Sequence, residues 1–262
     1  MTAVTVTPPN LGDSFGKMVK LTLHNECRYC GKVSDSEIEL DEFAATLMLG
    51  CTSGKAACPE CAARIKEEEN RKLAAARIEE YLRTSGIDSE FLGTWDSNKG
   101  NRNLANAIRN NADKHLFIVG EYDTGKTRCA CVNLERQIKL GKKGKCYQFS
   151  KLAYLYSQMF AKGETSPDDF VKRLVNTADI VVIDDLCKRK VTQTAAEFLY
   201  DLLNTIYSSN PRCRLWVTAN FMPKHLDKKF ETVDLASAVA SRIDRLHDAG
   251  KLKLIKADGE VL

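Results

Sequence analysis

Short apolar runs alternate with longer amphipathic segments from Gly86 onward. Such alternation is typical of a parallel sheet whose strands are joined by crossover helices, so we predict an α/β domain over residues 86–262. The apolar runs predict four strands and a weaker fifth one, at residues 116–119, 146–149, 180–183, 215–219 and 252–255.

Helix signals lie between these runs. One predicted helix begins at Lys126 and ends before Gly141, another begins at Ser150, and a third begins at Ser166 with Pro167 in its first turn. Apolar residues at helical spacing predict two further helices, with stripes at Phe198, Leu199, Leu202, Leu203 and Ile206, and at Leu235, Val239, Ile243 and Leu246.

The first 85 residues show no such alternation. Residues 1–20 are polar and include Pro8, Pro9 and Gly12, so we expect a flexible leader. Residues 21–62 hold a cysteine-rich block. Residues 63–85 are rich in Ala, Glu, Lys and Arg, and their nearly balanced charges predict a helical linker with a solvated face that stops at Gly86.

Composition narrows the class of protein. With 44% hydrophobic residues among 262, the chain is long enough to bury a core. It shows neither a signal-peptide pattern nor an apolar stretch of membrane-spanning length, so we expect a cytoplasmic protein without a membrane partner. The net charge of +4 permits contact with phosphate or nucleic acid without demanding it.

A phosphate-binding motif follows the first predicted strand. It reads Gly120-Glu121-Tyr122-Asp123-Thr124-Gly125-Lys126-Thr127, and Arg128 comes next. In this pattern, backbone N–H groups and the positive end of the following helix bind phosphate oxygens. Lys126 is expected to bridge the β- and γ-phosphates of ATP, and the Thr127 hydroxyl to bind Mg²⁺. The alternative is a glycine-containing turn before a helix, without a ligand.

Two carboxylates end the apolar run at residues 180–183. Asp184 is expected to hold Mg²⁺ through its water shell, and Asp185 to orient or deprotonate the water that attacks the nucleotide. Glutamate is commoner than aspartate in the second position, so we expect the shorter side chain of Asp185 to slow hydrolysis. The alternative is a helix N-cap followed by a solvated aspartate.

Three more polar residues are candidates for the same reaction. Asn220 follows the run at 215–219 and either contacts the γ-phosphate or is a turn residue. Arg242 and Arg245 lie three residues apart on the last predicted helix. One of them reaches the nucleotide of a neighbouring subunit, which would make hydrolysis depend on assembly, or both are surface arginines paired with nearby aspartates.

The N-terminal cysteines form two C-x-x-C pairs with 27 residues between them, at Cys27, Cys30, Cys58 and Cys61. Each pair aims two thiolates at one tetrahedral ion, and four sulfurs leave no open position for catalysis, so the pairs predict a structural zinc site. Cys51 and His24 are spare ligands, and either can replace one of the four. The alternatives are reduced cysteines without a ligand and a redox pair.

Several of these motifs belong together: the phosphate-binding motif, the run Asp184-Asp185-Leu186-Cys187-Lys188, the strand end Thr218-Ala219-Asn220 and the pair Ser241-Arg242. As a set they resemble the DnaC/IstB-like family of AAA+ ATPases, which are helicase loaders and transposition helpers, over about residues 86–250. The resemblance implies an AAA+ P-loop core preceded by a zinc-binding domain that grips the replicative helicase. It also implies Asn220 as the sensor, Arg242 as the first candidate for an arginine finger in trans and Arg245 as the second.

Two features depart from the family pattern. Cys187 stands where members usually have Gly, and Arg128-Cys129 stands where a His-Leu pair is usual. Neither change touches phosphate chemistry directly. The chain ends soon after Ile255, so no helical lid with a sensor arginine is expected.

Single-stranded DNA is a further expected partner. Stacking rings and cations suit unpaired strands, and the candidate contacts are Lys151, Tyr154, Tyr156, Phe160, Lys162, Lys188, Arg189 and Lys190. Core packing explains the aromatic residues equally well. The lysines near the end of the helix that begins at Lys126 are explained more simply as solvated groups that compensate the helix dipole than as DNA contacts.

We therefore expect a DNA-replication ATPase that loads a replicative helicase onto single-stranded DNA and self-associates through its AAA+ domain, with ATP, Mg²⁺ and zinc as cofactors. The alternatives are an IstB-like regulator of transposition and a zinc adaptor that binds ATP without turnover. A kinase acting on a metabolite would need an acceptor pocket and an Arg-rich lid, and the sequence offers neither.

Overall fold

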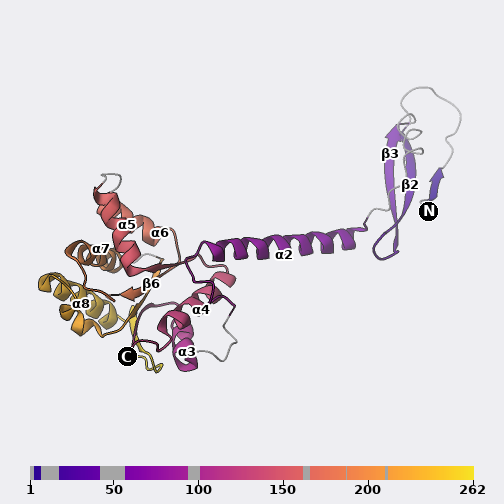
Figure 1. Ribbon diagram of the computed structural model, residues 1–262. Coiled ribbons are helices and arrows are strands. Elements are labelled where there is room, and N and C mark those ends of the chain that lie inside the picture. The colour runs from indigo at the N-terminus through magenta and orange to yellow at the C-terminus, as the bar shows by residue number, and fades with distance from the viewer. Residues whose placement is uncertain are drawn as a thin grey trace. The chain divides into compact units, whose positions relative to one another are not determined.

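The chain forms two compact units, Met1–Ala76 and Arg77–Leu262 (Figure 1). The computed structural model describes residues 3–6, 18–41, 57–93, 101–161, 166–186, 188–209 and 212–262. None of the helices in these ranges combines the length and apolar character that a membrane crossing needs.

The larger unit is built on a five-stranded parallel sheet with the order β5-β6-β7-β4-β8. Its strands are β4 (His115–Val119), β5 (Gly144–Gln148), β6 (Ile180–Leu186), β7 (Arg214–Ala219) and β8 (Leu252–Lys256). Each apolar run that predicted a strand forms one, so the predicted α/β class is confirmed. One boundary was wrong: Phe149 begins a helix, where its ring lies 6.5 Å from that of Phe198.

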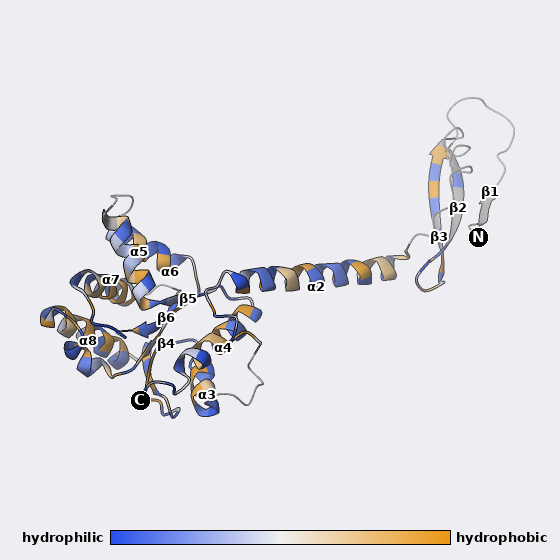
Figure 2. Cartoon of the chain, viewed as in Figure 1, coloured by the Kyte–Doolittle hydropathy of each residue, from blue (hydrophilic) through white to orange (hydrophobic). Residues whose placement is uncertain are grey.

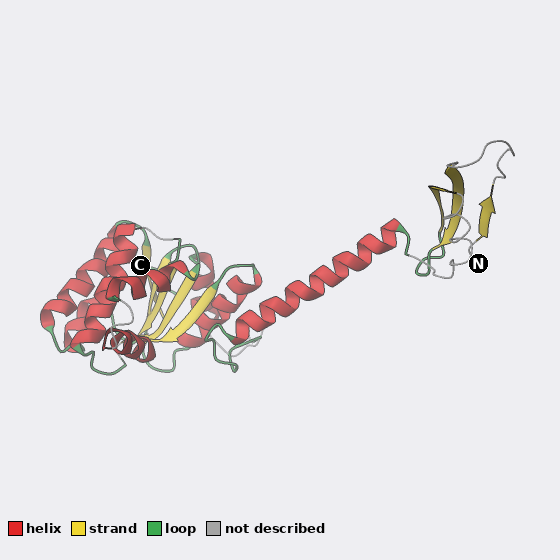
Figure 3. Cartoon of the chain, turned by 90° about the horizontal axis from the view of Figure 1, so that it is seen from above, coloured by secondary structure: helices red, strands yellow, loops and turns green. Residues whose placement is uncertain are grey.

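Helices cover both faces of this sheet, and Figure 3 shows its strands between two groups of helices. The first group contains α3 (Arg102–Asn110) and α4 (Lys126–Lys139). The second group contains α5 (Phe149–Ala161), α6 (Pro167–Asn176), α7 (Gln193–Ser209) and α8 (Val233–Asp248), and a 3₁₀ helix, η1 (Pro223–Lys228), precedes α8.

The central strands β4, β6 and β7 are largely apolar because both of their faces are buried. In β4, Leu116 and Ile118 join the core cluster beneath α3 and α4, whereas Phe117 and Val119 join the cluster beneath α5 to α8. Full burial of each such side chain stabilises the fold by about 1.5–3 kcal/mol. The sheet therefore forms a rigid support for the polar loops at the carboxyl ends of its strands.

Helix α3 was not predicted from the sequence. Asn101 caps it, since its side-chain oxygen accepts a hydrogen bond from the Leu104 N–H at 3.0 Å. Leu104, Ala107 and Ile108 are its buried residues. Their spacing is helical, but the segment is short and rich in asparagine, which lowers its helix propensity.

Helix α2 (Pro59–Arg83) confirms the predicted helix between the cysteines and Gly86. Figure 2 shows hydrophilic and apolar residues interspersed along it. Its charged residues are exposed, as expected, whereas Ile78, Tyr81 and Leu82 near its C-terminal end pack against the core of the larger unit. These three residues have the spacing of a short apolar stripe, but the charged residues around them make this stripe hard to recognise in the sequence.

The smaller unit contains an antiparallel sheet of three strands in the order β1-β2-β3. They are β1 (Ala3–Val6), β2 (Met18–Glu26) and β3 (Val33–Asp41). The expectation of a leader without regular structure is wrong for β1 and the start of β2. Val4 and Val6 alternate with threonine, a pattern of β-branched residues that favours a strand despite the prolines that follow.

Candidate functional site

The loop between β4 and α4 carries the predicted phosphate-binding motif. Gly125 has a φ of +82° and is the N-cap residue of α4, and no side chain caps the helix there. The first N–H groups of α4 are therefore available to an anion, which the helix dipole also favours. A Cβ on Gly120 would lie 2.3 Å from that of Ala257, so only glycine lets the loop pack against the end of β8.

The side chain of Lys126 is folded back onto this loop. Its ammonium group donates hydrogen bonds to the Glu121 carbonyl oxygen at 2.5 Å and to Thr124 Oγ1 at 3.2 Å. Burial lowers the pKa of Lys126, although the negative charges of nearby aspartates act to raise it. The loop thus holds a partly desolvated cation beside uncapped helix donors, which is an environment suited to phosphate.

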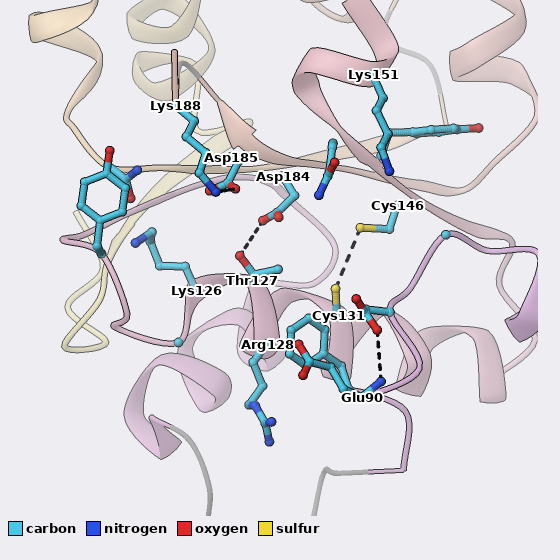
Figure 4. A pocket seen from close by; sticks show the side chains of 18 of the residues that line it. Glu90, Lys126, Thr127, Arg128, Cys131, Cys146, Lys151, Asp184, Asp185 and Lys188 are labelled. Carbon is cyan, nitrogen blue, oxygen red and sulfur yellow. Dashed lines mark hydrogen bonds and ion pairs between the residues drawn. The ribbon is translucent and has the colours of Figure 1, made fainter.

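Two hydroxyl groups converge on the Asp184 carboxylate at the end of β6. Thr127 Oγ1 donates to Asp184 Oδ1 at 2.8 Å (Figure 4). Thr218 Oγ1 donates to the same oxygen at 2.6 Å. Asp184 is only 6% exposed. Burial raises its pKa, whereas the hydrogen bonds from Thr218 and Thr127 oppose that shift. A cation beside this carboxylate would stabilise its charged form.

Asp185 adopts a backbone conformation that is unusual for its residue type. Its φ is +57°, and the pairing of β6 with β7 shifts register between Ile183 and Leu186. The Asp185 N–H donates to Thr218 Oγ1 at 3.0 Å, which holds the irregularity in place. Two consecutive aspartates therefore both line one cavity, instead of pointing to opposite faces of the sheet.

These groups line a cavity of about 830 Å³, a size typical of a site for a cofactor or nucleotide. Among the predicted site residues it brings together Tyr122, Asp123, Gly125, Lys126, Thr127, Arg128, Asp184, Asp185 and Asn220. Asn220 follows β7, and its buried Nδ2 has no hydrogen-bond partner among the described residues. An unpaired buried donor is costly, so Asn220 is placed to bind a ligand oxygen.

One wall of the cavity was not predicted from the sequence. Besides Cys146, Gln148, Leu155 and the two lysines expected only as DNA contacts, Lys151 and Lys188, the unpredicted lining includes this wall of residues after α2, namely Gly86, Asp88, Glu90 and Phe91. The Arg128 guanidinium lies 5.4 Å from the centre of the Phe91 ring, which links this wall to α4. Gly86 was the one available signal in the sequence, and it indicated only the end of a helix.

The two candidate arginine fingers lie on α8, outside the residues that line this cavity. The Arg242 guanidinium lies over the rings of Tyr207, at 5.3 Å, and of Tyr200, at 5.8 Å. Arg245 is exposed to solvent. Neither arginine lines this cavity in its own chain, so a role for either one there requires a second subunit.

Some of the candidate DNA contacts are exposed in the fold, and one is buried. Tyr154 is exposed on α5, and Lys188 to Lys190 are exposed after β6. The expectation for Tyr156 is wrong, because this residue is buried against Phe198 and donates a hydrogen bond to Asp201 at 3.1 Å. Lys162 lies outside the described residues, and for Phe160 only the backbone in α5 is described.

In the smaller unit, the four predicted cysteines meet at one point. The first pair lies in the turn between β2 and β3, and the second pair stands at the start of α2. Their sulfur atoms, in Cys27, Cys30, Cys58 and Cys61, all lie within 4.8 Å of one another. The sulfurs of a tetrahedral zinc site with bonds of about 2.3 Å are about 3.8 Å apart, and the distance from Cys30 Sγ to Cys58 Sγ is 3.8 Å.

The four thiols differ in their tendency to ionise, because the side chains of Cys30 and Cys58 raise the pKa of Cys61 whereas the backbone favours the thiolate of Cys27. A hydrogen bond from the backbone of Cys58, aided by those of Tyr29 and Cys30, lowers the pKa of Cys27 to about 6. Thiolates are the form that binds metal. Of the two spare ligands, Cys51 lies outside the described residues, and for His24 only the backbone in β2 is described.

Comparison with known proteins places the chain in a protein family. The family described as "IstB-like ATP binding protein" matches residues 58–260, which is most of the chain. The cavity, the phosphate-binding loop and the two aspartates all lie within the matched range. No curated protein sequence matches the chain.

Several solved structures are similar to part of the chain. A structure of AMPPCP-bound DnaA from Aquifex aeolicus has 19% identity and a TM-score of 0.45, and the match covers 61% of this chain and 47% of that one. The DnaC helicase loader has 18% identity and a TM-score of 0.47, with 67% and 97% covered. DnaI has 17% identity and a TM-score of 0.48, with 68% and 93% covered.

The chain thus spans about half the length of that DnaA and nearly all of the DnaC and DnaI chains. With TM-scores below 0.5, these likenesses assign no function to it.

Proposed function

The chain belongs to the family of IstB-like ATP-binding proteins, and we propose that it is a Mg²⁺-dependent ATPase that loads a replicative helicase onto single-stranded DNA. Its larger unit, an AAA+ P-loop core, would bind and hydrolyse ATP. Its smaller unit would be a zinc-binding module that grips the helicase. The observation that carries the proposal is the convergence of Thr127 and Thr218 on the buried carboxylate of Asp184, with the Asp185 N–H bonded to the same Thr218 hydroxyl.

That convergence fits a magnesium-bound triphosphate. Mg²⁺ prefers oxygen ligands and keeps several waters, and the Thr127 hydroxyl and the Asp184 carboxylate offer oxygen alone. When bound, the ion would neutralise charge on the β- and γ-phosphate oxygens. Thr218 contributes by orienting Asp184 from the neighbouring strand, so that the carboxylate faces the first turn of α4.

The remaining groups have separate roles. Lys126 would leave the Glu121 carbonyl and place its charge on the β- and γ-phosphates. Asp185, which lines the cavity without being fully buried, would accept a proton from the attacking water. Asn220 would donate its unpaired Nδ2 hydrogen to an oxygen of the γ-phosphate or to that water.

The cysteine cluster supports a structural role for zinc. Four thiolates close a tetrahedral shell and leave no position for substrate. The apolar residues that pack with the four sulfurs are few, with Ala57 the partly buried neighbour among the described residues. Metal binding would therefore supply a large part of the folding free energy of this module, on the order of 10 kcal/mol.

Self-association would complete the ATPase. Arg242, and after it Arg245, would reach the nucleotide of a neighbouring subunit and stabilise the charge that develops on the γ-phosphoryl group. The position of both arginines on α8, outside the cavity of their own chain, supports an action in trans. Hydrolysis would then depend on protein concentration.

A measurement of phosphate release tests the enzymatic part of the proposal. With Mg²⁺, ATP and single-stranded DNA, we expect turnover by the parent protein and a loss of at least about tenfold in Asp185→Asn, since removal of a catalytic base costs about 10²–10⁴-fold. Lys142→Ala, at an exposed position outside the cavity, is the control and should match the parent. An Asp185→Asn rate equal to the parent's would rule out hydrolysis by this arrangement.

The identity of the protein partner needs an experiment separate from the ATPase measurement. An IstB-like role in transposition is the second candidate, because the matching family is described by that name. Recovery of a hexameric helicase with the tagged chain would support loading. Filaments that form on duplex DNA with ATP, together with a transposase partner, would instead support transposition.

A further inference from the structure

Helices α7 and α8 pack side by side on one face of the sheet (Figure 1). Two tyrosines of α7, Tyr200 and Tyr207, are about two helical turns apart, so their side chains lie on the same face of the helix. The guanidinium carbon of Arg242, on α8, lies 5.3 Å from the centre of the Tyr207 ring and 5.8 Å from that of the Tyr200 ring. The fold thus holds one of the two candidate arginine fingers against a pair of aromatic rings of its own chain.

No carboxylate neutralises this arginine in the described part of the chain. Its neighbours three and four positions away along α8 include no acidic residue, and they are Ala238, Val239, Arg245 and Leu246. Within the residues that the structure describes, the side chain of neither arginine forms an ion pair or donates a hydrogen bond to an oxygen atom. Two cations at this spacing repel each other, so this edge of α8 suits an anion from outside the chain.

The type of contact determines what Arg242 can still bind. A guanidinium over an aromatic face is attracted by the ring electrons and gives up none of its N–H donors to an oxygen. A carboxylate partner would instead occupy some of those donors and cancel the charge. Arg242 is therefore restrained as a cation whose N–H donors are free to bind phosphoryl oxygens, which a guanidinium holds in a forked geometry.

Arg245 lacks such a restraint. Its side chain is exposed, and among the described residues no aromatic ring lies over its guanidinium. A long side chain that moves freely loses rotamer freedom when a ligand fixes it, and this loss weakens the contact. The rings restrict Arg242 beforehand and so reduce the loss. The geometry favours Arg242 over Arg245 for contact with an anion of a second subunit.

We propose that Tyr200 and Tyr207 are positioning residues for Arg242. They hold its guanidinium through their ring faces, so that its N–H donors reach the γ-phosphoryl oxygens of ATP in the cavity of a second copy of this chain. There the arginine stabilises the negative charge of the transition state of hydrolysis. The inference rests on the proposed ATPase function, and it adds two residues that lie outside the sequence motifs.

Mixed subunits test the proposal, because the arginine and the cavity that it serves then come from different chains. Full-length Asp185→Asn protein supplies an intact Arg242, and full-length Arg242→Ala protein supplies an intact cavity. Each protein alone should hydrolyse ATP slowly. With ATP, Mg²⁺ and single-stranded DNA, an equimolar mixture should release phosphate at least about threefold faster than the mean of the two separate proteins, since an arginine that acts in trans is restored.

The ring is then changed in one kind of subunit at a time. Tyr207 is the better target, because it is 37% exposed, whereas Tyr200 packs against the core. Tyr207→Leu in the Asp185→Asn subunits should lower the rate of the mixture about three- to tenfold at an unchanged KM for ATP. The same substitution in the Arg242→Ala subunits should have no effect, because no arginine is left for the ring to hold. Tyr207→Phe keeps the ring and should preserve the rate in either place.

The outcomes separate this inference from the function on which it rests. A parent protein that releases no phosphate under any condition would contradict the proposed function. An active parent beside a mixture that regains no rate would overturn the action of Arg242 in trans, and the positioning role with it. An active mixture in which Tyr207→Leu acts equally in both subunits, or in neither, would overturn the positioning role alone. Equal losses in Tyr207→Phe and Tyr207→Leu would do the same, because the ring would not be what holds the arginine.

Discussion

Thr127 and Asp184 stand 57 residues apart in the sequence, and the hydroxyl of the first donates to the carboxylate of the second at 2.8 Å. The contact joins the first turn of α4 to the end of β6. In the sheet, β6 is separated from β4 by β7, and β7 supplies Thr218 as the second donor to the same oxygen. The candidate site therefore depends on three strands that lie side by side.

Thr218→Val tests the role of the bridging hydroxyl. The substitution keeps the shape of the side chain but removes the acceptor for the Asp185 N–H and a donor to Asp184. Because it leaves buried polar groups without a partner, we expect the free energy of unfolding to fall by about 1–3 kcal/mol. We also expect the rate of phosphate release to fall, since both aspartates lose their orientation.

Thr218→Ser is the matched control, because it retains the hydroxyl. Chemical denaturation and phosphate release should place it close to the parent. A loss in the serine variant with none in the valine variant would show that the methyl group, rather than the hydroxyl, is what the site requires.

The cysteine cluster predicts one zinc ion per chain. Purified protein should contain zinc at a ratio near one by mass spectrometry of the metal, and Cys61→Ser should lower that ratio sharply because a three-thiolate shell is incomplete. Cys213→Ser changes a buried cysteine of the larger unit and is the control. A full zinc content in Cys61→Ser would refute the four-cysteine assignment.

The stability of the larger unit should depend on pH through His115. This residue is buried, and its Nδ1 accepts a hydrogen bond from the Leu215 N–H at 3.0 Å. Burial, aided by the charges of Arg214 and Lys251, lowers the pKa of His115 to about 4. Above the unfolded pKa of about 6.5 both states are neutral, so no stability is lost there.

Between about pH 6.5 and 4 the unfolded chain binds the proton and the folded one does not, so acidification destabilises the fold. The loss should approach about 3 kcal/mol at pH 4. His115→Asn keeps an acceptor but has no proton to bind, so denaturation curves across this window should show a smaller loss in the variant. Parallel pH profiles for parent and variant would contradict the prediction.

The sequence predicted the core of the larger unit well because its strands are buried on both faces. Runs such as Ile180 to Ile183 are apolar at every position, and no helical pattern competes with them. The motif loop and the first aspartate were equally readable, since their residue types follow from the chemistry of phosphate and Mg²⁺. Local signals of this kind need no knowledge of what packs against them.

The remaining features depend on contacts between distant segments. The positive φ of Asp185 and its bond to Thr218 arise from a register shift between two strands, which no local pattern encodes. The wall around Phe91 and the packing of Ile78 depend equally on tertiary contacts. Strand β1 is a different case, because its alternation was present in the sequence and was outweighed by the neighbouring prolines.

The central claim, that the loop before α4 holds a magnesium-bound triphosphate, is tested most directly by isothermal titration calorimetry. Titration of the parent with ATP in the presence of Mg²⁺ should release heat with one site per chain, and Lys126→Ala should show no measurable binding at the same concentrations. No heat from the folded parent, or the same isotherm from both proteins, would contradict the claim.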